Sequence, residues 1–310
     1  MKLNLRNYLA VIAAISLLSG SCGPEGDSNG IDSAKNGGDS ITVTGLKVKG
    51  QSFLMPSPMI VADMIKKSGA LYDKNMLNPA ANLGNYSDGM KRSLNLGVYG
   101  ADLGYITMYD NSGDAMEYYK AVVKLGEQLK ITGSFDANLM KRFNDNVGKK
   151  DSILSLVGEA YRRSDNFLRE SDQDNTATLI LAGGWMESIY FALNVYKAKP
   201  EESMAVRIGE QKSTVAGLVS ILKEAGKVET PEGEPASSEV KPEYKELIRL
   251  FEELNAEYQK IEIKYTFAEP VNDEAHHMTT INGKTEVKIS AEQIDTLLEK
   301  VTAIRNYITK

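Results

Sequence analysis

The chain has 310 residues, of which 36 are Lys or Arg and 42 are Asp or Glu, and it contains one cysteine and two histidines. The resulting net charge of −6 argues against nucleic acid or an anionic lipid surface as its partner. A single cysteine excludes an intrachain disulfide, and two histidines leave little material for histidine catalysis. The length is sufficient for one large domain with a substantial core.

The first 21 residues have the organisation of a secretory signal. Lys2 and Arg6 precede an apolar run over 8–18, which is too short to span a bilayer. Cys22 follows, and the whole stretch resembles a bacterial lipoprotein signal, although Ser19 stands where that motif more often has Leu. We therefore expect cleavage after residue 21 and lipid attachment at Cys22. Removal of Lys2 and Arg6 leaves 34 basic residues and a net charge of −8.

Residues 22–40 are predicted to form a flexible tether. They are rich in Gly, Ser, Asp and Asn, and Ile31 is their one large apolar residue, so they cannot bury enough surface to fold. Glu25 and Asp27 resemble the surface-export signal of Bacteroidota lipoproteins. We expect a lipid-anchored protein of the cell envelope, at the outer membrane, on either the periplasmic or the surface face.

Residues 41–310 are predicted to form a single mainly helical domain. The fold class that we expect is all-α, as a multi-helix bundle or a helical-hairpin array, with a small C-terminal β-hairpin. A low-complexity stretch at 227–242 is predicted to be a mobile loop, and Ser290 and Gln293 form a capping box before the last helix. Helices are predicted over 57–68, 87–109, 113–130, 136–147, 152–169, 176–196, 203–225, 243–263 and 291–309.

The stretch 176–196 is the longest segment of the mature chain with almost no charge, and the other helices are expected to enclose it. It is apolar nearly all round, and Glu187 is its only acid. The helix over 87–109 is similar, because Asp102 is its only charge between Arg92 and Asp110. Its glycines cost helix propensity and therefore indicate close approach of another backbone or of a ligand; they are Gly97, Gly100 and Gly104.

The period of the sequence changes near the C-terminus. Residues 276–281 and 284–289 flank Asn282-Gly283, the preferred pair for a two-residue hairpin turn. A strand predicted over 41–48 is expected to add to this hairpin as a third strand. His276 and His277 lie among acids, but adjacent residues of a strand face opposite sides, so we expect a solvated polar entry to the hairpin and no metal site. No cofactor is expected.

Asp102 and Glu187 are the best candidates for chemistry, because an unpaired buried carboxylate needs a partner or stays protonated. If their helices pack together, the two acids would flank one ligand pocket, lined by Tyr99, Tyr105, Trp185 and Tyr190. The alternative is structural, with each acid held by a basic side chain or by backbone donors. No catalytic set is recognisable, so the expected role is non-enzymatic binding, with a carboxylate-dependent hydrolase or lyase as the alternative.

A weak internal echo exists at an offset of 83 residues. It aligns Gly100 with Gly183 and 125–128 (LGEQ) with 208–211 (IGEQ). A repeated helical unit would explain it, and so would chance. A helical repeat adaptor is thus a further alternative.

Two segments carry a resemblance to a known family. They are SLNLGVYGADLGYITMY over 93–109 and NTATLILAGGWMESIY over 175–190. With them the chain resembles an uncharacterised family of Bacteroidota lipoproteins, over roughly residues 53–197. The resemblance implies an envelope location and a helical fold, and it transfers no catalytic residue. The expected partners are the membrane, through the N-terminal lipid, and an envelope protein or small ligand, with no nucleic acid.

Overall fold

The structure is a computed structural model, and it describes residues 43–48, 51–56, 58–131, 137–146, 149–171, 173–230, 237–267, 271–273, 278–280 and 284–310. The chain divides into residues 1–32 and 33–310, and the first unit lies wholly outside these ranges. The predicted signal, the tether and Cys22 therefore lie outside the described residues.

The fold is all-α with a small C-terminal β-hairpin, as the sequence predicts. Every predicted helix is present, with ends that differ by a few residues. Ser290 and Gln293 form the expected capping box, in which each side chain accepts from the other residue's backbone N–H. The helices are α1 Pro58–Lys67, η1 Lys74–Met76, η2 Ala80–Asn85, α2 Gly89–Met108, α3 Ser112–Gln128, α4 Ala137–Asp145, α5 Lys150–Glu170, α6 Asp174–Ala198, α7 Glu202–Ala225, α8 Pro242–Gln259 and α9 Ala291–Thr309.

Helices α2 and α6 form the centre of this domain and pack on each other more extensively than any other pair of described elements. Their contacts advance in the same sense along both helices, from Leu94 beside Gly183 to Tyr105 beside Phe191. The two helices therefore run in the same direction. By length and composition α6 is apolar enough to cross a membrane, yet 78% of its most apolar window is buried inside the protein, as expected of a core helix.

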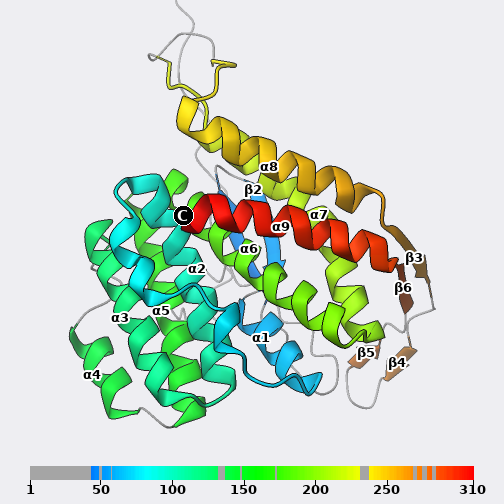
Figure 1. Cartoon of the computed structure of the whole chain (residues 1–310), viewed down its shortest axis with the longest axis horizontal. Helices are drawn as coiled ribbons and strands as arrows, with labels where there is room; N and C mark the ends of the chain where they lie inside the picture. The colour runs from blue at the N-terminus through cyan, green and yellow to red at the C-terminus, as the bar shows by residue number, and fades with distance from the viewer. Residues whose placement is uncertain are drawn as a thin grey trace, which may run out of the picture. The chain divides into compact units, whose positions relative to one another are not determined.

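The remaining helices enclose this pair. Helix α3 packs on α2, and α1 contacts both central helices. Figure 1 shows α9 between α8 and α6, and α9 also reaches α2, whereas α8 rests on α7. The C-terminal helix therefore lies directly over the charge-poor centre. This position decides where its one inward-facing cation, Arg305, is placed.

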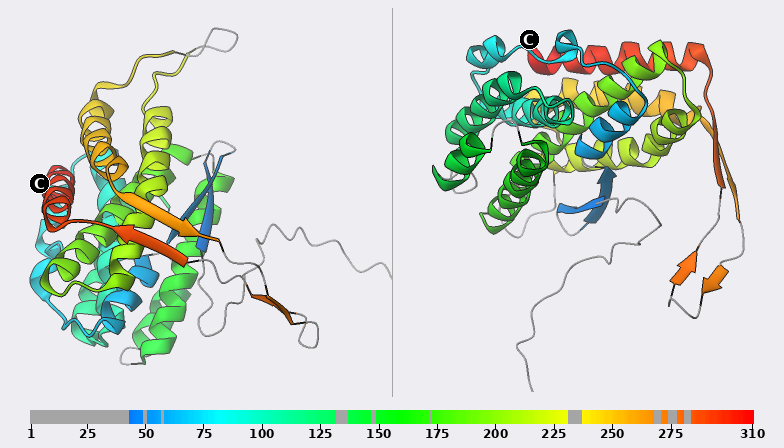
Figure 2. Two further views of the ribbon diagram at one scale, coloured as in Figure 1. Left: turned by 90° about the vertical axis from the view of Figure 1, so that its right-hand side faces the viewer. Right: turned by 90° about the horizontal axis from the view of Figure 1, so that it is seen from below.

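The strands form three antiparallel pairs within the described ranges, and their pairing corrects the prediction. β1 (Val43–Val48) pairs with β2 (Gln51–Pro56) and not with the C-terminal strands. β3 (Glu262–Thr266) pairs with β6 (Lys284–Lys288), and β4 (Val271–Asp273) pairs with β5 (Met278–Thr280). The hairpin is thus a longer ribbon whose two arms are β3 with β4 and β5 with β6. It leads away from the adjoining ends of α8 and α9 (Figure 2).

Two sequence signals explain the wrong pairing. β5 and β6, the strands on either side of 281–283, pair with β4 and β3 and not with each other, so the tight hairpin predicted from Asn282-Gly283 is wrong, and that pair itself lies outside the described residues. The predicted helix over 243–263 ends at Gln259 and leaves Glu262–Thr266 free to be the missing partner strand.

Both ends of the predicted loop at 227–242 are tied together, because Lys227 and Val240 form a β-bridge.

Candidate functional site

The crossing of α2 and α6 places the two isolated acids together, and glycines permit the approach. A Cβ added to Gly97 would lie 1.9 Å from the carbonyl oxygen of Ile180, and one added to Gly183 would lie 1.9 Å from that of Leu94. Such distances are impossible for real Cβ atoms, so only glycine fits at either position. The prediction of close backbone approach at Gly97 is confirmed. The contact also explains why the charge-poor segments carry helix-weakening residues.

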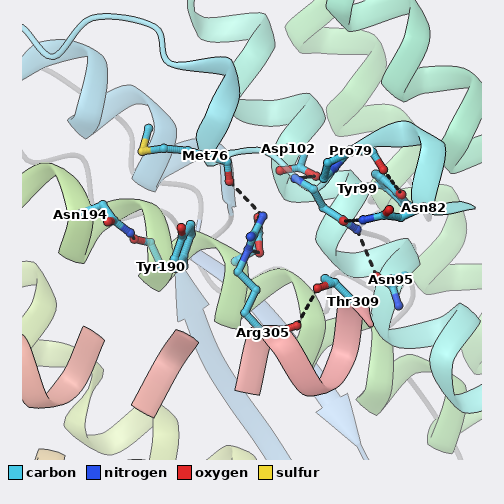
Figure 3. A network of polar contacts seen from close by, with 12 residues as sticks. Met76, Pro79, Asn82, Asn95, Tyr99, Asp102, Tyr190, Asn194, Arg305 and Thr309 are labelled. Atoms are coloured by element: carbon cyan, nitrogen blue, oxygen red, sulfur yellow. Dashed lines mark hydrogen bonds and ion pairs between the residues drawn. The ribbon is translucent and has the colours of Figure 1, made fainter. Parts of the chain in front are cut away.

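Glu187 is fully buried and forms an ion pair with Arg305 of α9. Arg305 Nε lies 2.7 Å from Oε2, and Nη2 lies 2.7 Å from Oε1, so the guanidinium grips both carboxylate oxygens. Nη2 also donates to the carbonyl oxygen of Met76 at 2.9 Å. Figure 3 shows Arg305 reaching from α9 to Met76, with Tyr190 beside it. Its charge centre stands 4.4 Å from the ring centroid of Tyr190, a cation–π contact.

Asp102 is also fully buried and lies against Glu187. Its Oδ2 accepts from the backbone N–H of Asn78 at 3.3 Å, whereas Oδ1 has no donor. Burial and the negative charge of Glu187 raise the pKa of Asp102 well above its usual value. In its protonated form Asp102 donates a hydrogen bond to Glu187, and this bond lowers the pKa of Glu187. Burial raises the pKa of Glu187 and Arg305 opposes that effect.

Of the two acids, Asp102 is therefore the one whose neutral form the site favours, and the charge of Glu187 is balanced by Arg305. Two adjacent carboxyl groups that are buried away from water cannot easily both be ionised. A neutral acid, a carboxylate and a guanidinium are therefore a stable combination in such a site. The cluster joins three helices that are far apart in the sequence. It is placed to fix α9 on the central pair.

A second set of polar contacts extends this cluster to the end of α9. Asn95 lies two turns before Asp102 on the same face of α2, and its Nδ2 donates to the carbonyl oxygen of Ile308 at 2.9 Å. Asn78 Nδ2 donates to Asn95 Oδ1 at 3.3 Å and to Tyr86 Oη at 2.9 Å. Lys91 Nζ donates to the carbonyl oxygen of Tyr307. Side chains of α2 thus satisfy the carbonyls that the last turn of α9 leaves open.

The four predicted pocket aromatics lie in different surroundings. Tyr99 donates to the carbonyl oxygen of Pro79 at 2.9 Å, and Tyr105 accepts from the backbone N–H of Asp73 at 3.0 Å. Trp185 donates from Nε1 to Gln211 Oε1 at 3.0 Å, toward α7. Of the four aromatic residues, Tyr190 alone contacts the ion pair, because its ring lies against the guanidinium of Arg305. The six residues are therefore brought to one core, but their polar atoms do not converge on one point.

Sequence reasoning missed Arg305, Asn78 and Asn95. A signal for Arg305 existed, because Val301, Arg305 and Ile308 follow the three- and four-residue spacing of the buried face of the last helix. A cation inside an apolar stripe indicates a buried acid as its partner. Asn78 gave no such signal, since it lies in a turn-rich link whose path the sequence does not define.

A surface pocket of about 500 Å³ lies where α2 begins and α9 ends. Its lining is mixed, with acids, a lysine, an aromatic ring and apolar side chains. Lys91 is already engaged there, because its Nζ stands over the ring of Tyr307 at 4.5 Å. The lining residues are Asp88, Gly89, Met90, Lys91, Leu94, Glu243 and Tyr307.

The predicted internal echo does not extend to the helix ends. An offset of 83 residues carries the link over 109–111 onto 192–194, which lie inside α6. No group of three His, Cys, Asp or Glu is placed to hold a metal ion within the parts of the chain that the structure describes. His276 and His277 lie outside those parts. Comparison of the chain with protein-family models, curated proteins and solved structures gives no match.

Proposed function

We propose that this chain is a lipid-anchored binding or scaffold module of the bacterial envelope and acts without catalysis. The observation that carries the proposal is the ion pair of Glu187, whose two oxygens are both taken by Arg305. An acid that serves this contact fixes three helices relative to one another, which is what a rigid platform for a partner needs. The anchor part of the proposal rests on the sequence around Cys22.

Metabolic labelling of growing cells with an alkyne fatty acid tests the anchor. The full-length protein is expected to incorporate the label and to sediment with membranes, and its Cys22→Ala variant is expected to do neither. Chemical crosslinking in the same cells, followed by purification from the membranes, tests the binding role. The proposal is supported if one envelope protein is crosslinked to the wild-type chain and the yield of that crosslink is lower for the Cys22→Ala variant. Equal labelling and sedimentation of both chains contradicts it.

The hydrolase alternative keeps one supporting observation. Asp102, whose pKa is raised well above its usual value, lies beside Glu187, whose charge Arg305 favours, and an acid and base pair needs two such unequal carboxyl groups. Both groups are fully buried, so a substrate would reach them only after α9 moved away. Carbodiimide coupling of an amine probe at neutral pH distinguishes the two roles. Protection of both acids in the folded protein favours the structural role, and rapid labelling of Asp102 or Glu187 favours the enzyme.

A further inference from the structure

Strand β3 and the residue after it carry large apolar side chains that remain partly or mostly exposed among the described residues. Its side chains alternate, so Ile263 and Tyr265 share one side and Glu262 and Lys264 share the other, and Phe267 follows the strand directly. The exposed fractions of the three apolar residues are 38, 57 and 66%. Large apolar side chains exposed in a row at alternate positions are typical of an interaction surface.

The base of this face is already used for packing. Val287 of β6 lies directly opposite Ile263, and it fills the space beside Gly209 of α7, where an added Cβ would lie 2.6 Å from Val287 Cγ1. Exposure then rises along β3 with distance from that contact. The exposed face is therefore the continuation of a surface that packs on α7 at its base, and farther out no described residue covers it.

The outer edge of β3 supplies main-chain groups as well. Within the described ranges β3 pairs with β6 alone, and no backbone hydrogen bond between described residues joins its other edge to another segment. The unpaired N–H and C=O groups of such an edge can receive a further strand. An added strand would lie beside Ile263, Tyr265 and Phe267 and cover their exposed sides.

The size of the face favours an added strand over a second copy of this chain. If an aromatic side chain can bury roughly 200 Å², the exposed fractions correspond to about 300 Å² for all three residues. A standard interface needs about 800 Å² from each partner. Two copies joined through this face alone fall well short, whereas an extended peptide gains a row of main-chain hydrogen bonds in addition to the apolar contacts.

The charges on the other side of β3 define the peptide further. Glu262 stands opposite Lys288, with 3.8 Å between the charged atoms, and Lys264 stands opposite Glu286. A strand on the outer edge would meet an acid and then a base at alternate positions. A basic residue beside Glu262 and an acidic one beside Lys264 would match them.

We propose that the outer edge of β3 is the docking site for an extended segment of a partner protein, with alternating apolar side chains. This inference rests on the proposed binding function and names its surface. The probe is a display library of decapeptides with apolar residues at alternate positions and free choice between them, selected on the full mature chain in lipid nanodiscs. Enriched peptides are expected to carry one basic and one acidic residue at alternating polar positions.

The binding of an enriched peptide is then measured by fluorescence anisotropy. Combined Tyr265→Ser and Phe267→Ser substitution is expected to weaken binding at least tenfold with no change in melting temperature. The matched control is Leu71→Ser, because Leu71 is 87% exposed elsewhere and should not affect binding. Methylation of the peptide's backbone nitrogens at one set of alternate residues should abolish binding, and methylation at the other set should preserve it, since only one set pairs with β3.

Several outcomes would overturn the docking site. They are a library without enrichment, equal binding of the two methylated peptides, and undiminished binding to the double serine variant. Self-association that the serine variant abolishes would assign the face to a second copy. If the envelope protein crosslinked to the wild-type chain is equally crosslinked to the serine variant, the docking site fails while the proposed function stands. A library without an enriched peptide, together with a wild-type chain that crosslinks to no envelope protein, contradicts both the docking site and the proposed function.

Discussion

Glycines allow a close contact at two places in the protein, the crossing of α2 with α6 and the contact of the β3 and β6 ribbon with α7. The two contacts differ in the kind of atom that approaches the glycine. At Gly97 and Gly183 the neighbour is the backbone of the other helix. At Gly209 it is the side chain of Val287. Backbone inside two long helices cannot move aside, whereas a valine at the base of a two-stranded ribbon can shift. The first contact thus fixes the fold, and the second positions an appendage.

The largest effect is expected from Gly97→Ala or Gly183→Ala. Each added methyl group would overlap a carbonyl oxygen of the facing helix, and separating the helices would also open the buried acid cluster. We expect a loss of about 5 kcal/mol or more in the free energy of unfolding, at the extreme end for a single substitution. Urea unfolding followed through the single, buried Trp185 measures it.

Gly89→Ala is the matched control for these variants, because Gly89 begins the same helix α2 and an added Cβ there meets nothing within 4 Å. It should be neutral or slightly stabilising, since alanine favours the helix. A Gly97→Ala protein as stable as the Gly89→Ala protein would show that the crossing is not as tight as described.

The next largest effect is expected from Glu187→Gln. The substitution leaves the Arg305 charge, whose side chain is 15% exposed, without its carboxylate, and removal of one partner of a buried pair costs about 3–5 kcal/mol. Adding Arg305→Met should restore part of the loss, because no buried charge then remains. The same urea unfolding applies.

An exposed ion pair between the same two helices is the control. Lys197 Nζ of α6 lies 2.6 Å from Asp295 Oδ1 of α9, and both side chains are more than half exposed. Asp295→Asn should therefore lower the free energy of unfolding by less than about 1 kcal/mol. If the two substitutions have similar effects, the buried cluster does not hold α9 in place.

The helices could be predicted from the sequence because the spacing of apolar residues within each one shows which of its faces is buried. The close approach of α2 to α6 could be predicted in part, because helix propensity and burial both favour a larger side chain than that of Gly97 at this position. The proximity of Asp102 and Glu187 was a conditional prediction that the packing of the two helices fulfils.

The pairing of the strands could not be predicted. Local turn chemistry at Asn282-Gly283 favours a tight hairpin there, but the pairing is set by β3, which lies some twenty residues away and continues from a helix. The spacing within the last helix marks Arg305 as a residue of the buried face, but it does not say that Glu187 is the acid it pairs with. Arg305 is 118 residues away in sequence, and only the folding of α9 over α6 brings it near.

The buried cluster should also give the domain a pH-dependent stability. The folded state holds the Asp102 proton at pH values where the unfolded chain, with an ordinary pKa near 3.8, has released it. Stability from this group is therefore complete below that value and decreases as the pH rises toward the raised pKa of the folded state.

Asp102→Asn removes this dependence, because the amide keeps a donor for Glu187 and an acceptor for Asn78 without a titratable proton. Relative to the wild type, the Asn variant should gain stability as the pH rises above the ordinary pKa near 3.8, up to the raised pKa of Asp102 in the folded state. Urea unfolding at several pH values measures the difference. Parallel curves for the two proteins would mean that Asp102 is already ionised in the folded state.

A smaller effect is expected from Gly209→Ala. Its methyl group would meet Val287 at 2.6 Å, but here a side chain can yield, so the cost should stay at about 1–2 kcal/mol. Adding Val287→Ala should recover part of it, because the clash is with the valine itself. No side-chain substitution can relieve Gly97→Ala in this way, and a rescue of Gly97→Ala by shortening a neighbouring side chain would erase the contrast between the two contacts.

The smallest effect on stability is expected from the double Tyr265→Ser and Phe267→Ser variant. Both side chains are mostly exposed, so the folded state loses little burial when they are shortened, and the melting temperature should stay within about 1 °C of the wild type. Differential scanning calorimetry of the two proteins measures it. The same pair is expected to carry the binding of an extended partner, so the ribbon's exposed face should separate binding from stability, which the α2 and α6 crossing cannot do. A melting temperature lowered by several degrees would place these aromatic rings in a packed part of the fold and remove the basis for a docking face.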